Sequence, residues 1–288
     1  MGRIIMIIAI FASVFTSAWG VRIEVKEPAL FEVLYTKHVV HDTIYGESPA
    51  TDAQMALRVG KTSSMFYPVK CLWKDSLMHY NVALFFEIDR KNWEEGERKT
   101  GVWNPLGGRE WEYIFKNMPE GKWTVKNRFD LDDRVYEEDI EVPQWEIEDS
   151  VKVILGYECQ KAVTDFRGRK WMAWFAPDIP VSDGPWKLSG LPGLILEAYD
   201  IKYHYIFTAT GMLKENPDVK VGIFIFSDCI KMTRDSYLKA RYRAQPRPGK
   251  QSLGDMLRAA HGIESKTKDT RKKIVYPYYD YEETNYPH

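Results

Sequence analysis

The sequence predicts a mainly β protein, a β-rich α+β fold built on an antiparallel sheet with short helices near its C-terminus. Three observations support this prediction. Apolar and polar residues alternate from Trp145 to Cys159, as in a strand with one buried face. Runs rich in β-branched and aromatic residues recur between residues 28 and 228, separated by glycine and proline turns. Helical patterns follow after residue 228.

The first part of the chain is expected to contribute several strands. Residues 28–45 favour a first strand or pair of strands, and residues 64–67 resume the sheet after a brief apolar run within residues 55–59. Residues 89–111 are charged and glycine-rich and contain three tryptophans. This composition predicts a hairpin tip or a long loop.

The alternation that begins at Trp145 predicts a half-buried antiparallel strand with a bulge or bend at Gly156. A hairpin turn at Gly168 leads into a second strand over residues 171–175. Three prolines within residues 176–188 each remove a backbone donor, so this segment is not expected to form an interior strand or helix.

Residues 191–194 fit a type II turn, in which Pro192 presets the first central dihedral and Gly193 supplies the positive φ of the second. This turn directs the chain into a strand over residues 194–200.

The chain changes character after Asp228. Residues 203–210 and 221–228 extend the sheet, and short helices are predicted within residues 233–246 and 252–262. Residues 264–288 are first charged and then rich in tyrosine, which predicts a poorly ordered or surface-lying tail.

The N-terminus is typical of a secretory signal peptide. Arg3 precedes an apolar stretch that ends at Val14, and residues 18–20 have the small-x-small pattern of a cleavage site. The stretch is shorter than the roughly 20 residues of a spanning helix, so we expect no transmembrane span in the mature chain. The protein is therefore expected to be exported and to lie in the periplasm, at the outer membrane or outside the cell.

Three regions follow from these assignments: a signal peptide over residues 1–20, an antiparallel β domain over 21–232, and short helices with a charged, tyrosine-rich tail over 233–288. The chain has 40 Lys and Arg against 41 Asp and Glu, a formal net charge of −1. This balance provides no electrostatic reason for a nucleic-acid partner.

The segments "ILGYECQKA", "GRKWMAWFAPDIP" and "GPWKLSGLPGLILEAYD" resemble the GLPGLI family of exported proteins from Bacteroidota-type bacteria. The likeness covers residues 28–210, and the namesake hexapeptide is Gly190–Ile195. The family has no established activity to carry over. The resemblance implies a curved antiparallel sheet, like a bowl or part-barrel, in an envelope or secreted protein. The motif residues are Gly184, Pro185, Gly190, Leu191, Pro192, Gly193, Leu194 and Ile195.

Three cysteines, Cys71, Cys159 and Cys229, lie in the exported part of the chain. An oxidising compartment permits one disulfide among three alternative pairings. The alternative is that all three are small buried apolar residues, and both interpretations stay open.

Two kinds of side chain are candidates for a site. Asp178 and Asp183 could form an acid/base pair or bind calcium, although aspartates beside proline and glycine usually bond their own turn. Trp171, Trp174 and Trp186 could stack on sugar rings or line a groove, although such rings usually fill the core of a curved sheet. The sequence contains no HExxH, GxSxG or phosphate-loop motif, so no catalytic residue, metal or cofactor is predicted.

We therefore expect a non-enzymatic envelope protein that binds a protein, lipid or glycan through the concave face of its sheet or through its loops. Two other functions stay open: an envelope peptide or glycan hydrolase with Asp178 and Asp183 as acid and base, and a structural subunit of an outer-membrane complex.

Overall fold

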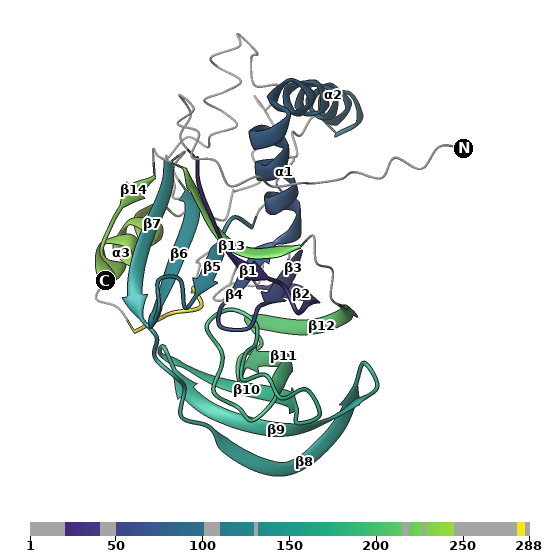
Figure 1. Ribbon diagram of the computed structural model, residues 1–288, viewed down its shortest axis with the longest axis vertical. Coiled ribbons are helices and arrows are strands. Elements are labelled where there is room, and N and C mark those ends of the chain that lie inside the picture. The colour runs from purple at the N-terminus through teal and green to yellow at the C-terminus, as the bar shows by residue number, and fades with distance from the viewer. Residues whose placement is uncertain are drawn as a thin grey trace, which may run out of the picture.

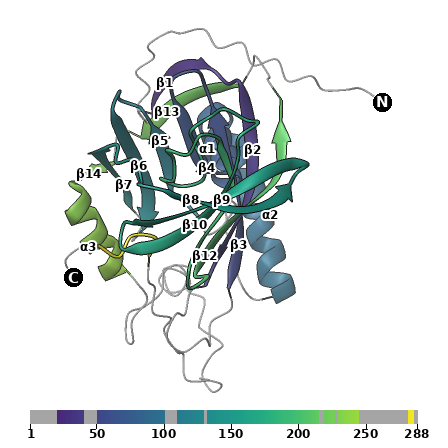
Figure 2. The ribbon, with the colours of Figure 1, turned by 90° about the horizontal axis from the view of Figure 1, so that it is seen from below.

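The dominant feature of the fold is one twelve-stranded sheet that curves around a buried interior (Figures 1 and 2). The computed structural model describes residues 21–40, 50–100, 110–129, 132–214, 219–226, 229–244 and 281–285. The strand order is β14-β7-β6-β5-β4-β3-β2-β12-β11-β10-β9-β8, with β14 parallel to β7 and all other neighbours antiparallel. The predicted mainly β fold with a curved antiparallel sheet is confirmed.

The strands are β1 (Val21–Pro28), β2 (Phe31–Val39), β3 (Thr51–Val59), β4 (Ser64–Pro68), β5 (Tyr113–Lys116), β6 (Lys122–Phe129), β7 (Asp132–Asp139), β8 (Glu146–Ile154), β9 (Tyr157–Phe166), β10 (Arg169–Ala176), β11 (Leu194–Asp200), β12 (Tyr205–Leu213), β13 (Lys220–Phe226) and β14 (Ile230–Lys231). The helices are α1 (Val69–Tyr80), α2 (Val82–Thr100) and α3 (Arg234–Ala244).

The predicted N-terminal strands are present, and one C-terminal strand pairs differently from expectation. β2, β3 and β4 form an antiparallel meander in the large sheet. β12 joins the same sheet by pairing with both β11 and β2. β13 does not extend it, because it pairs with β1 in a separate two-stranded sheet. β13 thus returns the C-terminal part of the β domain to its first strand.

The prediction of a hairpin tip or loop over residues 89–111 is wrong for its first half, because α2 continues to Thr100. Residues 101–109 lie outside the described part of the chain. Two ion pairs at i,i+4 spacing support the helix, Glu87 with Lys91 at 2.6 Å and Arg90 with Glu94 at 2.5 Å. The charges therefore stabilise a helix surface and do not mark a loop.

The alternating stretch from Trp145 contains a complete hairpin and not one strand with a bulge. Leu155 (φ 52°) and Gly156 (φ 85°) both adopt left-handed backbone conformations, as in the tight turns that join antiparallel strands, and connect β8 to β9. Val151 and Val153 are 60% and 70% exposed, so the predicted burial of this face is wrong for β8. β8 is the terminal strand of the sheet, where the curved interior ends. The turn predicted at Gly168 is confirmed between β9 and β10.

The C-terminal region agrees with the sequence in one helix and differs in its end. α3 confirms the helix predicted within residues 233–246, whereas the helix predicted over 252–262 lies outside the described residues. Residues 281–285 were expected on the surface, but Glu282 and Glu283 are buried. This short segment lies beside α3 and the β9–β10 turn (Figure 2, yellow). We call it the C-terminal strap.

Candidate functional site

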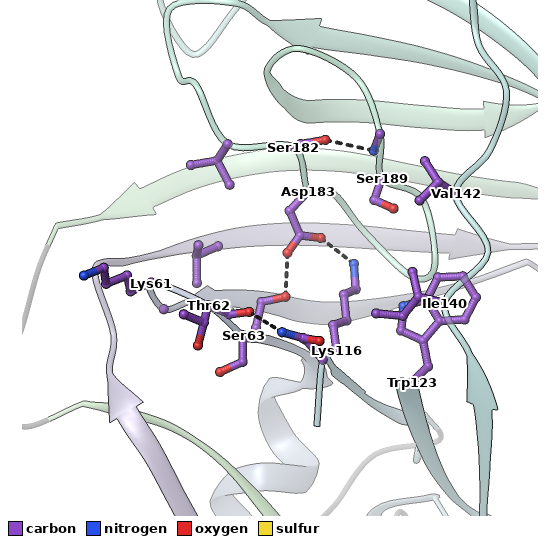
Figure 3. A pocket seen from close by; sticks show the side chains of 16 residues that line it. Lys61, Thr62, Ser63, Lys116, Trp123, Ile140, Val142, Ser182, Asp183 and Ser189 are labelled. Carbon is purple, nitrogen blue, oxygen red and sulfur yellow. Dashed lines mark hydrogen bonds and ion pairs between the residues drawn. The ribbon is translucent and has the colours of Figure 1, made fainter. Parts of the chain in front are cut away.

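Loops at one end of the sheet enclose a pocket of about 390 Å³, called here the loop pocket (Figure 3). Its walls come from the β3–β4 turn, the end of β5, Trp123 of β6, the segment after β7 and the loop between β10 and β11. The lining residues are Val59, Gly60, Lys61, Thr62, Ser63, Ser64, Lys116, Asn117, Trp123, Ile140, Val142, Val181, Ser182, Asp183, Ser189 and Gly190.

Asp183 is the central charged group of the loop pocket. Its Oδ1 accepts hydrogen bonds from Lys116 Nζ at 2.6 Å and from the Gly184 backbone N–H at 2.7 Å. Its Oδ2 accepts one from Ser64 Oγ at 2.5 Å. Ser64 and Lys116 are themselves Cα partners in the β4–β5 pairing. The carboxylate therefore ties the loop after β10 to two strands on the other side of the interior (Figure 3).

Lys116 is buried and held by more than one acceptor, since its Nζ also donates to the carbonyl of Gly184 at 2.7 Å. Burial lowers the pKa of Lys116 below its ordinary value, although the Asp183 charge acts in the opposite direction. A buried ammonium group is costly unless it is paired, so Asp183 has a structural task in this site.

The two candidate aspartates are not equivalent. Asp178 is exposed and does not line the loop pocket, whereas Asp183 faces Lys116 and Ser64. Both Asp183 oxygens accept hydrogen bonds, and one of them is paired with the Lys116 ammonium group. The geometry thus assembles an ion pair at this position and no carboxylate pair.

The rim of the loop pocket is fixed by a second carboxylate that lies outside it. Glu27 accepts hydrogen bonds from the backbone N–H groups of Lys61, Thr62 and Ser63 at 2.8–2.9 Å. Burial tends to raise the pKa of Glu27, but hydrogen bonds from Ser63 and Thr62 lower it to about 2. The carboxylate is therefore ionised at neutral pH, and the β3–β4 turn is held in one conformation.

The glycines of the GLPGLI-like segment act differently from the prediction. Gly190 has the positive φ, 93°, and its N–H donates to Ser182 Oγ at 3.1 Å across the pocket rim. Gly193 is not among the positive-φ glycines, so the type II turn is wrong. A Cβ at position 193 would lie 2.3 Å from the Ala176 carbonyl oxygen. Gly193 is required for close approach of two backbone segments.

The remaining motif residues build the wall behind the pocket. Leu191, Leu194 and Ile195 are buried in the main core, whereas Pro192 is exposed. Buried Gly184 packs so closely on Ile195 that a Cβ at position 184 would lie 2.7 Å from the isoleucine side chain. A further contact is the hydrogen bond from the Leu188 N–H to the Pro185 carbonyl at 3.1 Å.

None of the cysteines, all of which lie in the described part of the chain, forms a disulfide. Cys71 and Cys159 are buried, and Cys229 is half-buried. Burial raises the pKa of the Cys71 thiol to about 12 and also raises the pKa of Cys159. Groups that ionise this reluctantly are poor nucleophiles at neutral pH, so packing explains these two residues.

The candidate tryptophans divide between core and surface layer. Trp171 and Trp186 are buried with ring centroids 5.4 Å apart, so they fill the interior. Trp174 is half-buried, and Lys152 Nζ lies 4.4 Å from its ring centroid. None of the three lines the loop pocket, whose tryptophan is Trp123.

Sequence reasoning missed Ser64 and Lys116, because neither stands in a recognisable motif. Each is a polar residue at the end of an apolar strand. Polar residues are common at strand ends on protein surfaces, so this position does not mark a site. Across the described segments, no group of three or more His, Cys, Asp or Glu is arranged to hold a metal ion. Within the same segments, no helix combines the length and apolar character needed to cross a bilayer.

Part of this site lies in a stretch of the chain that matches a known protein family. Residues 167–197 match the family described as "Protein of unknown function (Porph_ging)". This stretch includes β10, the GLPGLI-like motif and one wall of the loop pocket. No curated protein sequence matches the chain.

Two crystal structures of PNGF-II, in space groups P21 and C2, are similar at 13% sequence identity with TM-scores of 0.46 and 0.45. The likeness covers 75% and 77% of this chain. The chain spans about a third of the solved structures, which are covered to 33% and 35%.

Proposed function

We propose that the protein is an exported member of the GLPGLI family that binds a saccharide unit of a cell-envelope glycan in the loop pocket, without catalysing a reaction. One observation carries this proposal: the pocket is preformed, because Asp183 and Glu27 fix parts of its wall through hydrogen bonds. A preformed concave site with a few fixed polar groups is typical of small-molecule binding.

The lining favours a saccharide over a lipid chain. Hydroxyl and amide groups of Thr62, Asn117 and Ser189 alternate around the pocket with apolar side chains such as Ile140 and Val142. A sugar ring has polar edges and an apolar face, and it would satisfy both kinds of group. Thr62 and Asn117 already bond within the protein, to Glu27 and to the Thr62 carbonyl. Their side-chain oxygens keep a further lone pair that a sugar hydroxyl could donate to and an acyl chain could not.

A purely structural role in an envelope complex is the second candidate, and exposed apolar side chains on the two helices favour it. Trp73 and Tyr80 on α1 and Phe86 on α2 are all exposed. Exposed aromatic residues of this kind are enriched in protein interfaces.

A pull-down from the cell envelope tests both proposals. The tagged mature protein is compared with Val142→Trp, which fills the pocket mouth at a residue 49% exposed, and with Leu213→Trp, a matched substitution 52% exposed on β12. We expect the unmodified protein and Leu213→Trp to retain a glycan detected by mass spectrometry, and Val142→Trp to lose it at unchanged melting temperature. Glycan retention by Val142→Trp, or no glycan on any form, would contradict the pocket proposal. A stoichiometric protein that stays bound to both variants would support the structural role.

A further inference from the structure

The C-terminal strap, Tyr281–Asn285, lies in a highly cationic part of the sheet interior. Glu283 forms ion pairs with Lys187 and with Arg234, whose Nε lies 2.9 Å from Glu283 Oε2. Glu282 Oε1 accepts a hydrogen bond from Lys37 Nζ at 2.6 Å. Both glutamates are buried, so the contacts are made away from solvent.

The interior also binds the backbone of the strap. Arg169 donates from Nε and Nη2 to the Tyr281 carbonyl at 2.9 and 2.7 Å. The Thr284 N–H donates to the Arg167 carbonyl at 2.9 Å, and Thr284 Oγ1 donates to the Gly168 carbonyl at 2.9 Å. Main-chain bonds combined with side-chain charge pairs are the usual means of recognising an extended peptide.

Without the strap, the buried groups around it would carry more positive than negative charges. Six cations line this region, and four largely buried carboxylates outside the strap contact them. Among the buried groups alone, two positive charges are left for the two strap carboxylates to neutralise. Glu141 and Asp235 reach the cluster from more exposed positions. The six cations are Lys37, Arg167, Arg169, Lys187, Arg234 and Arg241.

Lys187 is held in place independently of the strap. The preceding residue, Trp186, has a φ of 52°, a conformation that costs energy for a bulky side chain. Lys187 is almost completely buried, with its Nζ 5.7 Å from the ring centroid of Trp123 and 5.4 Å from that of Tyr136. Its Nζ also forms an ion pair with Glu138 Oε1 at 2.6 Å, so Lys187 keeps an anionic partner outside the strap.

The strap does not use every donor that this region offers. The Nε–H of Arg167 is buried and has no hydrogen-bond partner. The strap is also separated from α3 by residues 245–280, so its position is not imposed by a short connection. These features are those of a ligand site occupied by a tethered peptide.

We call the region around the strap that these six cations line the cationic groove. We propose that it is a binding site for an extended acidic peptide with two successive carboxylates, and that the C-terminal strap occupies it in cis. An acidic segment of another protein would make the same contacts to Lys37, Lys187 and Arg234 once the strap leaves. The site is distinct from the loop pocket and does not depend on the function proposed for that pocket.

Fluorescence anisotropy with a labelled, end-blocked Tyr-Glu-Glu-Thr-Asn peptide tests the proposal on the full-length chain. The double variant Glu282→Gln/Glu283→Gln weakens the cis occupant and leaves the groove intact. We expect it to bind the peptide at least about tenfold more tightly than the unmodified protein, because a site occupied in cis is open for a small fraction of the time. A Tyr-Gln-Gln-Thr-Asn peptide is the control, and adding Lys187→Met should abolish binding. A folded double variant that binds neither peptide, or both equally, would overturn the proposal.

A second measurement covers the case in which the double variant does not fold. A full-length chain with a protease site introduced within residues 245–280 is folded, cleaved and then mixed with excess acidic peptide. Release of the C-terminal fragment by the acidic peptide and not by its glutamine form is the expected result. A cleaved fragment that stays bound against both peptides would show that the strap is a permanent part of the core, contrary to the proposal.

Discussion

Gly193→Ala is expected to destabilise the protein because of close backbone packing and not because of a turn conformation. The added Cβ would lie 2.3 Å from the Ala176 oxygen and 2.7 Å from its carbonyl carbon. Ordinary contact needs a separation larger by about 1 Å, so one of the two backbone segments must move. Overpacking of this kind costs about 1–3 kcal/mol. The Ala176 oxygen also accepts the N–H of Ile179 at 3.1 Å, and losing that bond adds about 1 kcal/mol.

The expected loss is therefore about 2–4 kcal/mol in the free energy of unfolding, or roughly 3–7 °C in melting temperature for a chain of this size. Chemical denaturation followed by tryptophan fluorescence gives the first quantity, and a thermal scan gives the second. Gly211→Ala is the matched control, because a Cβ at that position would meet nothing within 4 Å. It should change stability by less than about 1 kcal/mol. Equal midpoints for the two variants would refute the close-approach argument.

Three other predictions follow from buried charges and thiols. A thiol reagent should modify half-buried Cys229 before buried Cys71, because the pKa of Cys71 is raised to about 12. Thiol counting on the denatured, non-reduced protein should find three free thiols. A count of one would reveal a disulfide. Asp183→Asn leaves the buried Lys116 ammonium without its carboxylate and should lower the free energy of unfolding by about 3 kcal/mol. The double variant Asp183→Asn/Lys116→Met should recover part of this loss. Unchanged stability of the single variant would contradict a structural ion pair. Burial tends to raise the pKa of Glu283, but neighbouring cations lower it to about 2, from 4.5. Because its pKa is lower in the folded state than in the unfolded state, ionised Glu283 stabilises the fold above pH 4.5, and about 3 kcal/mol of unfolding free energy is lost as the pH falls towards 2. In Glu283→Gln, the unfolding free energy should therefore depend less on pH between 4.5 and 2. The same pH dependence in the variant and the unmodified protein would exclude this contribution.

Local signals explain what the sequence could predict. The β9–β10 turn depends on Gly168 with φ 83°, and the strands beside it have their own alternating pattern, so each feature is encoded within a few residues. The alternating pattern also predicts the β8 strand. It does not predict that β8 is exposed, because the burial of a strand depends on its position in the sheet.

Features formed by distant residues were beyond sequence reasoning. The hydrogen bond between Lys37 and Glu282 joins residues 245 positions apart, and the sequence near either residue does not predict it. Gly193 was recognised as constrained, but its real constraint is the carbonyl of Ala176, which only the folded chain brings close. The charges of α2 favoured a loop by composition, while their i,i+4 spacing stabilises a helix.

Trp123 gives the two proposed sites a common wall. Its side chain lines the loop pocket, and Lys187 of the cationic groove lies 5.7 Å from its ring centroid. Thermodynamic linkage then sets a strict condition: if a pocket ligand that shifts this ring changes the affinity of the groove by some factor, a groove ligand must change the affinity of the pocket by the same factor. Displacement of the C-terminal strap would in that case be measurable as a change in pocket affinity, and the single indole ring would couple the two equilibria.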